Sequence, residues 1–208
     1  MLYNGQNPQI CGKIQRKYMG ETDKEQEGEN LTEQSVKDRI GEALLEFSAR
    51  KSLDKITVRD LVEACGISRQ SFYYHYQDIF EVVEWVIHKK ADKLMEKILQ
   101  TAKPEEAMDI FVDFAFDEKD FILYLLASKH RAFIERLLAH NMRQFLKDLI
   151  IQKVPDLPFR YGDMDTILSF YTYGLSGLLL EKSQTKNISR AQLKDQLKCL
   201  LPTRPRSE

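Results

Sequence analysis

The stretch Ile56–Tyr76, ITVRDLVEACGISRQSFYYHY, decides how the N-terminal half of the chain is expected to fold. Its first half spaces four apolar residues at i, i+3, i+4 and i+7, which predicts one face of a short helix. These residues are Val58, Leu61, Val62 and Cys65.

Start and stop signals frame two short helices in this stretch. Thr57 precedes the first helix and Asp60 follows three residues later, which is close to a capping box with Asp in place of Glu or Gln. Gly66 can take the left-handed conformation that ends a helix, and Ser68 offers a second N-cap. Two short helices joined by a tight turn predict a helix-turn-helix, whose second helix enters the major groove of DNA. The alternative is a surface turn on an ordinary helical protein.

The second helix has two unlike faces. Phe72 and Tyr76 lie four residues apart, and we expect them to pack inward with Ile67. The opposite face is polar and suits a DNA groove, because Arg can bond guanine in bidentate fashion and Gln can do the same to adenine. The residues expected on that face are Arg69, Gln70, Tyr73 and Tyr74.

The segment from the helix before Ile56 to the helix after Tyr76 resembles the DNA-binding domain of TetR-type transcriptional regulators. The motifs that carry the resemblance are Thr57-Val58-Arg59-Asp60-Leu61, Gly66-Ile67-Ser68 and Phe72-Tyr73-Tyr74-His75-Tyr76. The resemblance implies that Thr57 contacts a phosphate and that Arg59 reaches a base or a phosphate. It further implies base reading by Arg69 and Gln70 and backbone contacts from Ser71, Tyr73 and His75.

The chain departs from the family at the start of the next helix. Members usually carry a phosphate-binding Lys there, whereas this chain has Ile79, and Lys55 is a candidate substitute. The complete set of expected DNA-binding residues is Lys55, Thr57, Arg59, Ser68, Arg69, Gln70, Ser71, Tyr73, Tyr74 and His75.

Composition narrows the functional class. The 208 residues allow one large domain or two small ones, and the net charge of −1 excludes a generally basic nucleic-acid coat. Residues 50–75 carry five basic against three acidic side chains, which is the local patch that DNA binding needs. The sequence has no P-loop, no G-x-S-x-G and no H-E-x-x-H, so we expect neither an enzyme nor a cofactor.

The sequence also bears on the compartment. Cys11, Cys65 and Cys199 are spaced too widely for a disulfide framework or a zinc site, which favours a reducing cytosol. No apolar run approaches a membrane span, and the N-terminus lacks the apolar stretch of a signal peptide. We therefore expect a cytoplasmic protein without a membrane partner.

The remaining pattern predicts an all-α fold of about nine helices. We expect a disordered tail over 1–30, a helix-turn-helix domain over 31–77 and an all-helical regulatory and dimerisation domain over 78–208. The tail is either functionless or a basic arm in which Lys13, Arg16 and Lys17 enter a minor groove. The other helices are expected at 32–51, 78–100, 118–127, 130–153, 163–181, from Pro104 onward and from Ser189 onward.

The segment Phe170–Leu180, FYTYGLSGLLL, resembles the C-terminal domain of Firmicutes regulators similar to the dihydroxyacetone-kinase regulator. Those proteins usually continue with Trp, whereas Glu181 and Lys182 follow here. The family also implies an effector cavity, although aromatic residues at helical spacing can equally be core. The candidate lining residues are Phe111, Phe114, Tyr124, Phe170, Tyr171 and Tyr173.

Two further features leave alternatives open. Asp113, Asp117 and Asp120 form either a solvated helix edge or a metal site, and we expect no metal. The helix over 163–181 is apolar nearly all round, so it is either central in a single-chain core or covered by a second copy. In the second case the helix from Ser189 joins it, and the expected interface residues are Gly174, Gly177, Leu178, Leu193 and Leu197.

These patterns predict a dimeric, sequence-specific regulator that binds a palindromic site in double-stranded DNA. The leading hypothesis is a repressor released by a small apolar effector. The rival hypothesis is a co-activator that works through a protein partner and has no effector of its own.

Overall fold

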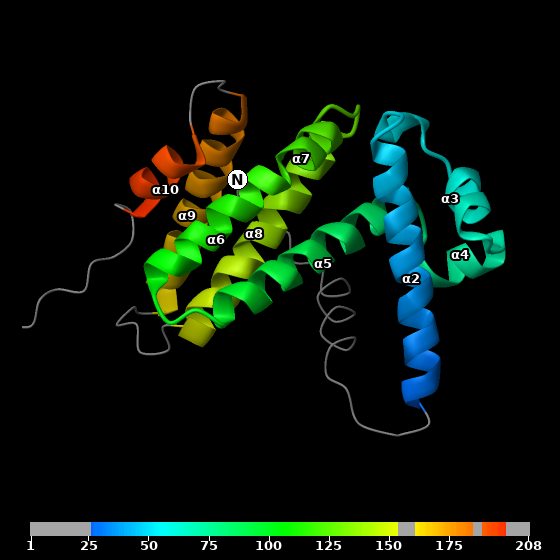
Figure 1. Ribbon diagram of the computed structural model, residues 1–208, viewed down its shortest axis with the longest axis horizontal. Helices are drawn as coiled ribbons and strands as arrows, with labels where there is room; N and C mark the ends of the chain where they lie inside the picture. The colour runs from blue at the N-terminus through cyan, green and yellow to red at the C-terminus, as the bar shows by residue number, and fades with distance from the viewer. Residues whose placement is uncertain (1–25, 154–160, 185–188, 199–208) are drawn as a thin grey trace, which may run out of the picture. The chain divides into compact units, whose positions relative to one another are not determined.

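The computed structural model describes residues 26–153, 161–184 and 189–198. Within these ranges the chain forms nine α-helices and one short 3-10 helix without any strand, which confirms the predicted all-α fold (Figure 1). The elements are α2 (Gln26–Ser48), η1 (Leu53–Lys55), α3 (Val58–Cys65), α4 (Arg69–His75), α5 (Ile79–Leu99), α6 (Pro104–Asp117), α7 (Lys119–Leu126), α8 (Arg131–Lys153), α9 (Tyr161–Gln184) and α10 (Arg190–Lys198).

The chain divides into two units, Met1–Asp38 and Arg39–Glu208. Among the described residues, the first unit holds only the start of α2. That helix begins at Gln26, inside the segment predicted as a tail. The predicted basic arm and the cysteines at 11 and 199 lie outside the described residues.

Helices α2, α3 and α4 share a small apolar core. Ile40 and Leu44 on α2, Leu61 on α3 and Phe72 on α4 are fully buried. These are the inward positions that helical periodicity favours. The core fixes α4 by one side and leaves its other side to solvent.

Helix α5 runs from this core into the C-terminal helices. Asp78 caps its start, with Oδ1 accepting from the N–H groups of Phe80 at 2.7 Å and Glu81 at 3.1 Å. Near that end α5 crosses α2 at Gly41, where an added Cβ would lie 2.5 Å from Cζ3 of Trp85. Only a residue without a side chain permits this approach.

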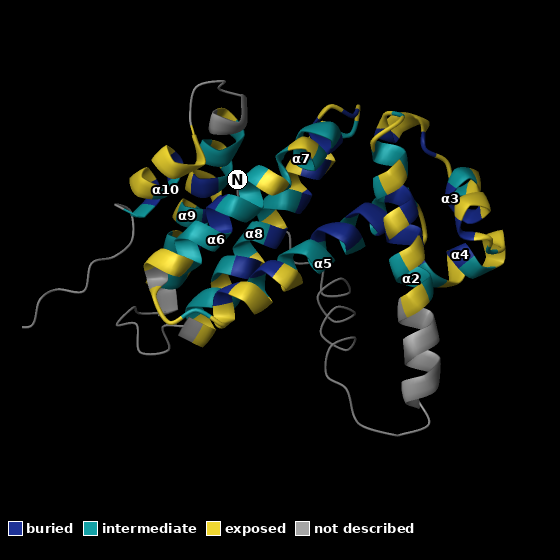
Figure 2. Cartoon of the chain, viewed as in Figure 1, coloured by how far each residue is buried: buried dark blue, intermediate teal, exposed yellow. Residues whose placement is uncertain are grey.

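The C-terminal helices form a second core around the other end of α5. It joins residues from α5, α6, α8, α9 and α10, which appear buried in Figure 2. Its fully or nearly fully buried members are Leu94, Ile98, Phe111, Val112, Phe145, Leu175, Leu193 and Leu197. At its edge Lys90 on α5 pairs with Glu118 at 2.7 Å.

Candidate nucleic-acid interface

The turn between α3 and α4 has the geometry that the sequence predicted. The Thr57 N–H donates to Asp60 Oδ2 at 2.7 Å, and the Asp60 N–H donates back to Thr57 Oγ1 at 3.2 Å, which completes a capping box. Gly66 ends α3 in the left-handed region at φ 62° and ψ 35°. Ser68 then caps α4 by accepting the N–H of Ser71 at 3.0 Å.

Helix α4 presents one face to solvent. Tyr73 is 57% exposed and Tyr74 is 78% exposed, while Phe72 between them and α3 is fully buried. Arg69 and Gln70 are exposed on the same short helix. The structure therefore brings together four of the predicted contact residues on a single accessible face.

The Thr57 hydroxyl is already engaged. It donates to Asp60 Oδ2 at 2.8 Å, and the same carboxylate oxygen lies 2.7 Å from Lys51 Nζ. The hydrogen bond with Lys51, followed by those with Thr57, lowers the pKa of Asp60 to about 2. A phosphate that approached Thr57 would compete with a stable carboxylate for its hydrogen.

The other predicted contacts lie on η1, at the start of α3 and at the end of α4. Arg59 Nε pairs with Glu63 Oε1 at 2.6 Å, and both side chains are well exposed. Lys55 is exposed at the end of η1, whereas His75 is half-buried at the end of α4. Arg59 is thus accessible, but its guanidinium is paired with the Glu63 carboxylate, and the sequence analysis did not predict this pair.

The turn between α7 and α8 contacts η1, and no sequence pattern predicts this contact. The backbone N–H of Lys129 donates to Asp54 Oδ2 at 3.1 Å. The next residue, His130, places its ring 4.6 Å from that of Phe80 at the start of α5. A short polar contact and a ring contact therefore connect the C-terminal helices to the elements that carry α4.

The aromatic residues predicted to line an effector pocket do not gather in one place. Phe111 is buried and stacks on Phe145 with ring centroids 6.1 Å apart, so it belongs to the core. Phe170 is 72% exposed and Tyr173 is 70% exposed on the outer face of α9. Burial, with a smaller effect of Asp54, raises the pKa of Tyr124 to about 12. The structure therefore does not bring the whole set of predicted pocket residues around one hollow; these are Phe111, Phe114, Tyr124, Phe170, Tyr171 and Tyr173.

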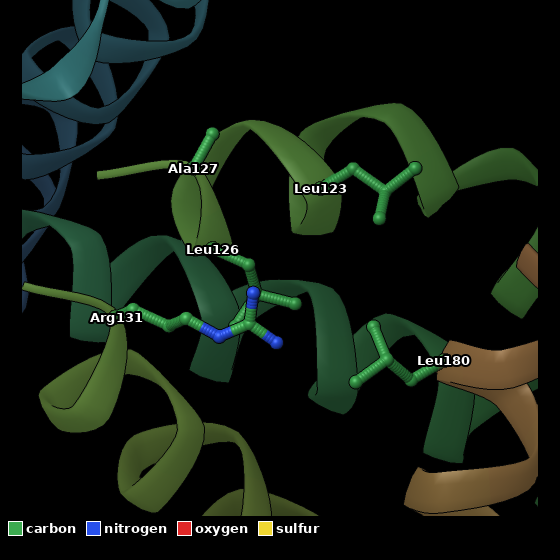
Figure 3. Close-up of a pocket in the computed structure, with 5 residues that line it drawn as sticks. All are labelled: Leu123, Leu126, Ala127, Arg131 and Leu180. Atoms are coloured by element: carbon green, nitrogen blue, oxygen red, sulfur yellow. The ribbon is translucent and has the colours of Figure 1, made fainter. Parts of the chain in front are cut away.

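A different hollow lies between α7, α8 and α9. It measures about 150 Å³ and contains none of the predicted pocket residues. Its lining, shown in Figure 3, consists of Leu123, Leu126, Ala127, Arg131 and Leu180. The sequence did not predict this hollow, because its leucines have the same spacing as leucines that face an ordinary helical core.

The structure places the residues of the predicted dimer interface in two different environments. Leu193 and Leu197 are buried against α6 within the same chain, because α10 packs its apolar side on the second core. Gly174 and Gly177 are instead exposed on α9, and a Cβ built on either meets no atom within 4 Å. The part of the predicted interface that remains accessible is thus the outer face of α9.

The aspartates of α6 do not form a simple solvated edge, because they pair with α10. Asp113 and Asp117 form ion pairs with Arg190 on α10. No group of three His, Cys, Asp or Glu side chains in the described ranges is arranged to hold a metal ion. Across the same ranges, no helix has both the length and the hydropathy of a transmembrane span.

Comparisons with known proteins agree with this architecture. A TetR-type family model described as transcriptional regulator C-terminal region matches residues 102–198. The HTH-type transcriptional regulator YerO of Bacillus subtilis, whose function is uncharacterized, is 30% identical over 101 residues, which cover 43% of this chain and 35% of YerO. The match thus spans about a third of that relative's length.

Two solved structures share the fold. The dihydroxyacetone kinase operon activator DhaS superposes with a TM-score of 0.59 at 15% identity, covering 80% of this chain and 93% of DhaS. The protein Lin0861 of Listeria innocua superposes with a TM-score of 0.63 at 16% identity, covering 88% of this chain and 93% of that protein. At these identities the likeness concerns the fold alone.

Proposed function

We propose that this chain is a TetR-type transcriptional regulator, as the family model over residues 102–198 supports, and that it controls transcription by inserting α4 into the major groove of double-stranded DNA. The observation that carries this proposal is the exposed face of α4, where Arg69, Gln70 and two tyrosines surround a buried Phe72 anchor. Arg and Gln are the side chains that bond guanine and adenine in bidentate fashion.

The remaining contacts are proposed to hold the DNA backbone. Ser68, Ser71, Tyr73, Tyr74 and His75 lie on or beside α4 and carry hydroxyl or ring N–H donors suited to phosphate oxygens. Lys55 at the end of η1 and Thr57 and Arg59 at the start of α3 are proposed to add to these contacts. Contacts to the DNA backbone fix the position of the protein on the duplex, and Arg69 and Gln70 are proposed to bond the bases.

We further propose a homodimer formed by α9. Phe170 and Tyr173 expose large apolar rings, which monomeric proteins seldom leave uncovered as a patch. Beside them, Gly174 and Gly177 leave room for the backbone of a second helix. A two-fold dimer would place two copies of α4 on the half-sites of a palindrome, about 34–36 Å apart or at a multiple of this spacing.

Within this function, the leading mechanism is repression released by a small apolar effector. The rival is a co-activator, and the structural relative DhaS is named as an operon activator. The exposed rings of Phe170 and Tyr173 support it, because a different protein could cover them as well as a second copy could. A repressor binds its operator unaided, whereas a co-activator needs its partner for a stable complex.

The test is binding-site selection from random duplex DNA with the purified full chain. Arg69→Ala should lower affinity for the selected site by about 1–3 kcal/mol and relax the preference at one base position. Arg136→Ala, which removes an exposed arginine from α8, serves as the control and should change neither. An unchanged base preference in Arg69→Ala would contradict the proposed reading of DNA.

A further inference from the structure

The hollow between α7, α8 and α9 combines an apolar wall with one cation. Four of its five lining residues are aliphatic, and the fifth is Arg131 at the first position of α8. An engineered apolar cavity of about 150 Å³ is known to take up benzene, so a single ring or a short branched chain fits a space of this size.

Arg131 remains available to an anion. Its Nε pairs with Glu135 Oε1 at 2.7 Å, but the two side chains are 55% and 47% exposed, and an exposed pair of this kind is weak. Glu135 is the only hydrogen-bond or ion-pair partner of the Arg131 side chain within the described ranges. In Figure 3 the Arg131 side chain extends from α8 toward Leu126 and Leu180.

The position of Arg131 also suits negative charge. The positive end of the α8 dipole lies at this residue, and a guanidinium can bind a carboxylate through two parallel hydrogen bonds. A small apolar monocarboxylate could contact the apolar wall and pair with Arg131 at the same time. A neutral analogue of the same shape could contact the wall alone.

The hollow lies next to the contact with η1. Ala127 and Arg131 line it on either side of the turn whose Lys129 N–H donates to Asp54 Oδ2 at 3.1 Å. Asp54 stands three residues before Thr57, the cap of α3. A ligand that displaces the ends of this turn therefore acts on the support of the helix-turn-helix.

We propose that this hollow binds a small apolar monocarboxylate, with the carboxylate on Arg131, and that occupancy changes DNA affinity through Lys129 and Asp54. The second half of the proposal rests on the proposed function; the binding itself does not.

Binding is tested by calorimetric titration of the full chain with three probes, namely benzoate, benzyl alcohol and acetate. Benzoate should bind at least about tenfold more tightly than either, because only benzoate offers both ring and charge. Arg131→Met should remove this advantage, while Arg136→Met, on the exposed side of the same helix, should keep it. Equal affinities for benzoate and benzyl alcohol, or equal losses in the two variants, would overturn the site.

A second variant guards against a folding artefact. Ala127 is exposed at the end of α7 with ordinary right-handed backbone angles, so Ala127→Phe should fill the hollow without disturbing the fold. It should abolish benzoate binding with an unchanged circular dichroism spectrum. Retained binding in this variant would place the ligand elsewhere.

Coupling is tested by measuring operator affinity with and without saturating benzoate. Benzoate should change the affinity of the wild type, and Asp54→Ala should bind benzoate normally while losing that change. If the wild type binds DNA but not benzoate, the ligand site is refuted and the proposed function is unaffected. If the wild type binds benzoate through Arg131 but does not bind DNA, the proposed function is refuted and the ligand site is unaffected.

Discussion

Lys194 of α10 places its Nζ atom 2.7 Å from Oδ1 of Asp113 on α6, in the middle of a ladder of interhelical ion pairs. Lys198 lies 2.8 Å from Asp109 on one side, and Arg190 pairs with Asp117 on the other. Both helices repeat their charges every four residues, so one face of each helix carries the whole ladder. Beneath it α10 buries two leucines in the C-terminal core.

The leucines, rather than the ladder, should hold α10 in place. Leu197→Ala should reduce the free energy of unfolding by about 2–5 kcal/mol, because it opens a cavity at a fully buried position. Lys194→Gln should cost less than about 1 kcal/mol, since its pair is partly exposed. Urea unfolding measures both.

Salt provides the control for this comparison. In 1 M NaCl the screening length falls to about 3 Å, so the effect of Lys194→Gln should vanish while that of Leu197→Ala persists. A larger loss from Lys194→Gln than from Leu197→Ala would show that charge dominates the attachment of α10.

Gly41→Ala should strain the crossing of α2 and α5. The new methyl would lie 2.5 Å from Trp85 Cζ3, and such overpacking costs about 1–3 kcal/mol, more than the roughly 1 kcal/mol that Ala gains in a helix. Trp85 is the only tryptophan, so its fluorescence should shift in this variant.

Gly174→Ala is the matched control, because a Cβ there meets nothing within 4 Å. It should leave the Trp85 emission unchanged. An identical spectrum for Gly41→Ala and the wild type would contradict the close crossing.

Asp60 should link stability to acid pH. Its pKa in the folded protein is about 2, below the ordinary value of 3.8, so its contribution is fully present above about pH 4 and is lost as the pH falls through about 2. Asp60→Asn should therefore cost about 1 kcal/mol at pH 7, as expected for a weakened helix cap, and almost nothing at pH 2. Urea unfolding across this range checks the prediction, and a constant difference would refute it.

Glu63→Gln should strengthen DNA binding. Glu63 holds Arg59 at 2.6 Å and adds a negative charge beside the proposed interface. Its neutralisation should raise affinity by about threefold or more at low salt and increase the salt slope by about one. Fluorescence anisotropy measures both, and Glu96→Gln, an equal charge change on α5, should leave them unaltered.

Gly177→Leu should weaken the proposed dimer without disturbing the fold, because the site is open in the monomer and a leucine would obstruct a close partner. Sedimentation should show monomers, with weaker operator binding and unchanged helical content. The control is Glu96→Leu, which places the same side chain at an exposed position of α5, and this variant should remain dimeric. A wild type that is monomeric at micromolar concentration yet binds its operator tightly would exclude the dimer.

Local signals account for what the sequence predicted well. Thr57, Asp60, Gly66 and Ser68 act on neighbours within about one helical turn, and the structure has each in its predicted role. Phe72 follows from helical periodicity in the same way.

Tertiary partners account for what the sequence could not predict. Periodicity gives Leu197 and Phe170 an apolar helix face but does not say whether that face meets the chain's own core or solvent. Lys194 and Asp113 are 81 residues apart, so their pairing becomes visible only in the folded chain. The hollow at Arg131 likewise forms where three separate helices meet.

The hydrogen of the Thr57 hydroxyl has two possible acceptors, and the folded protein already uses one. Asp60 receives it at 2.8 Å, whereas a phosphate oxygen, which cannot donate, would need the same hydrogen. Association with DNA through this residue is therefore an exchange of acceptors, and its net contribution is the difference between two similar bonds. Thr57 thus contributes more to holding α3 together than to affinity, and a bound phosphate would leave the first turn of α3 less firmly tied than it is without DNA.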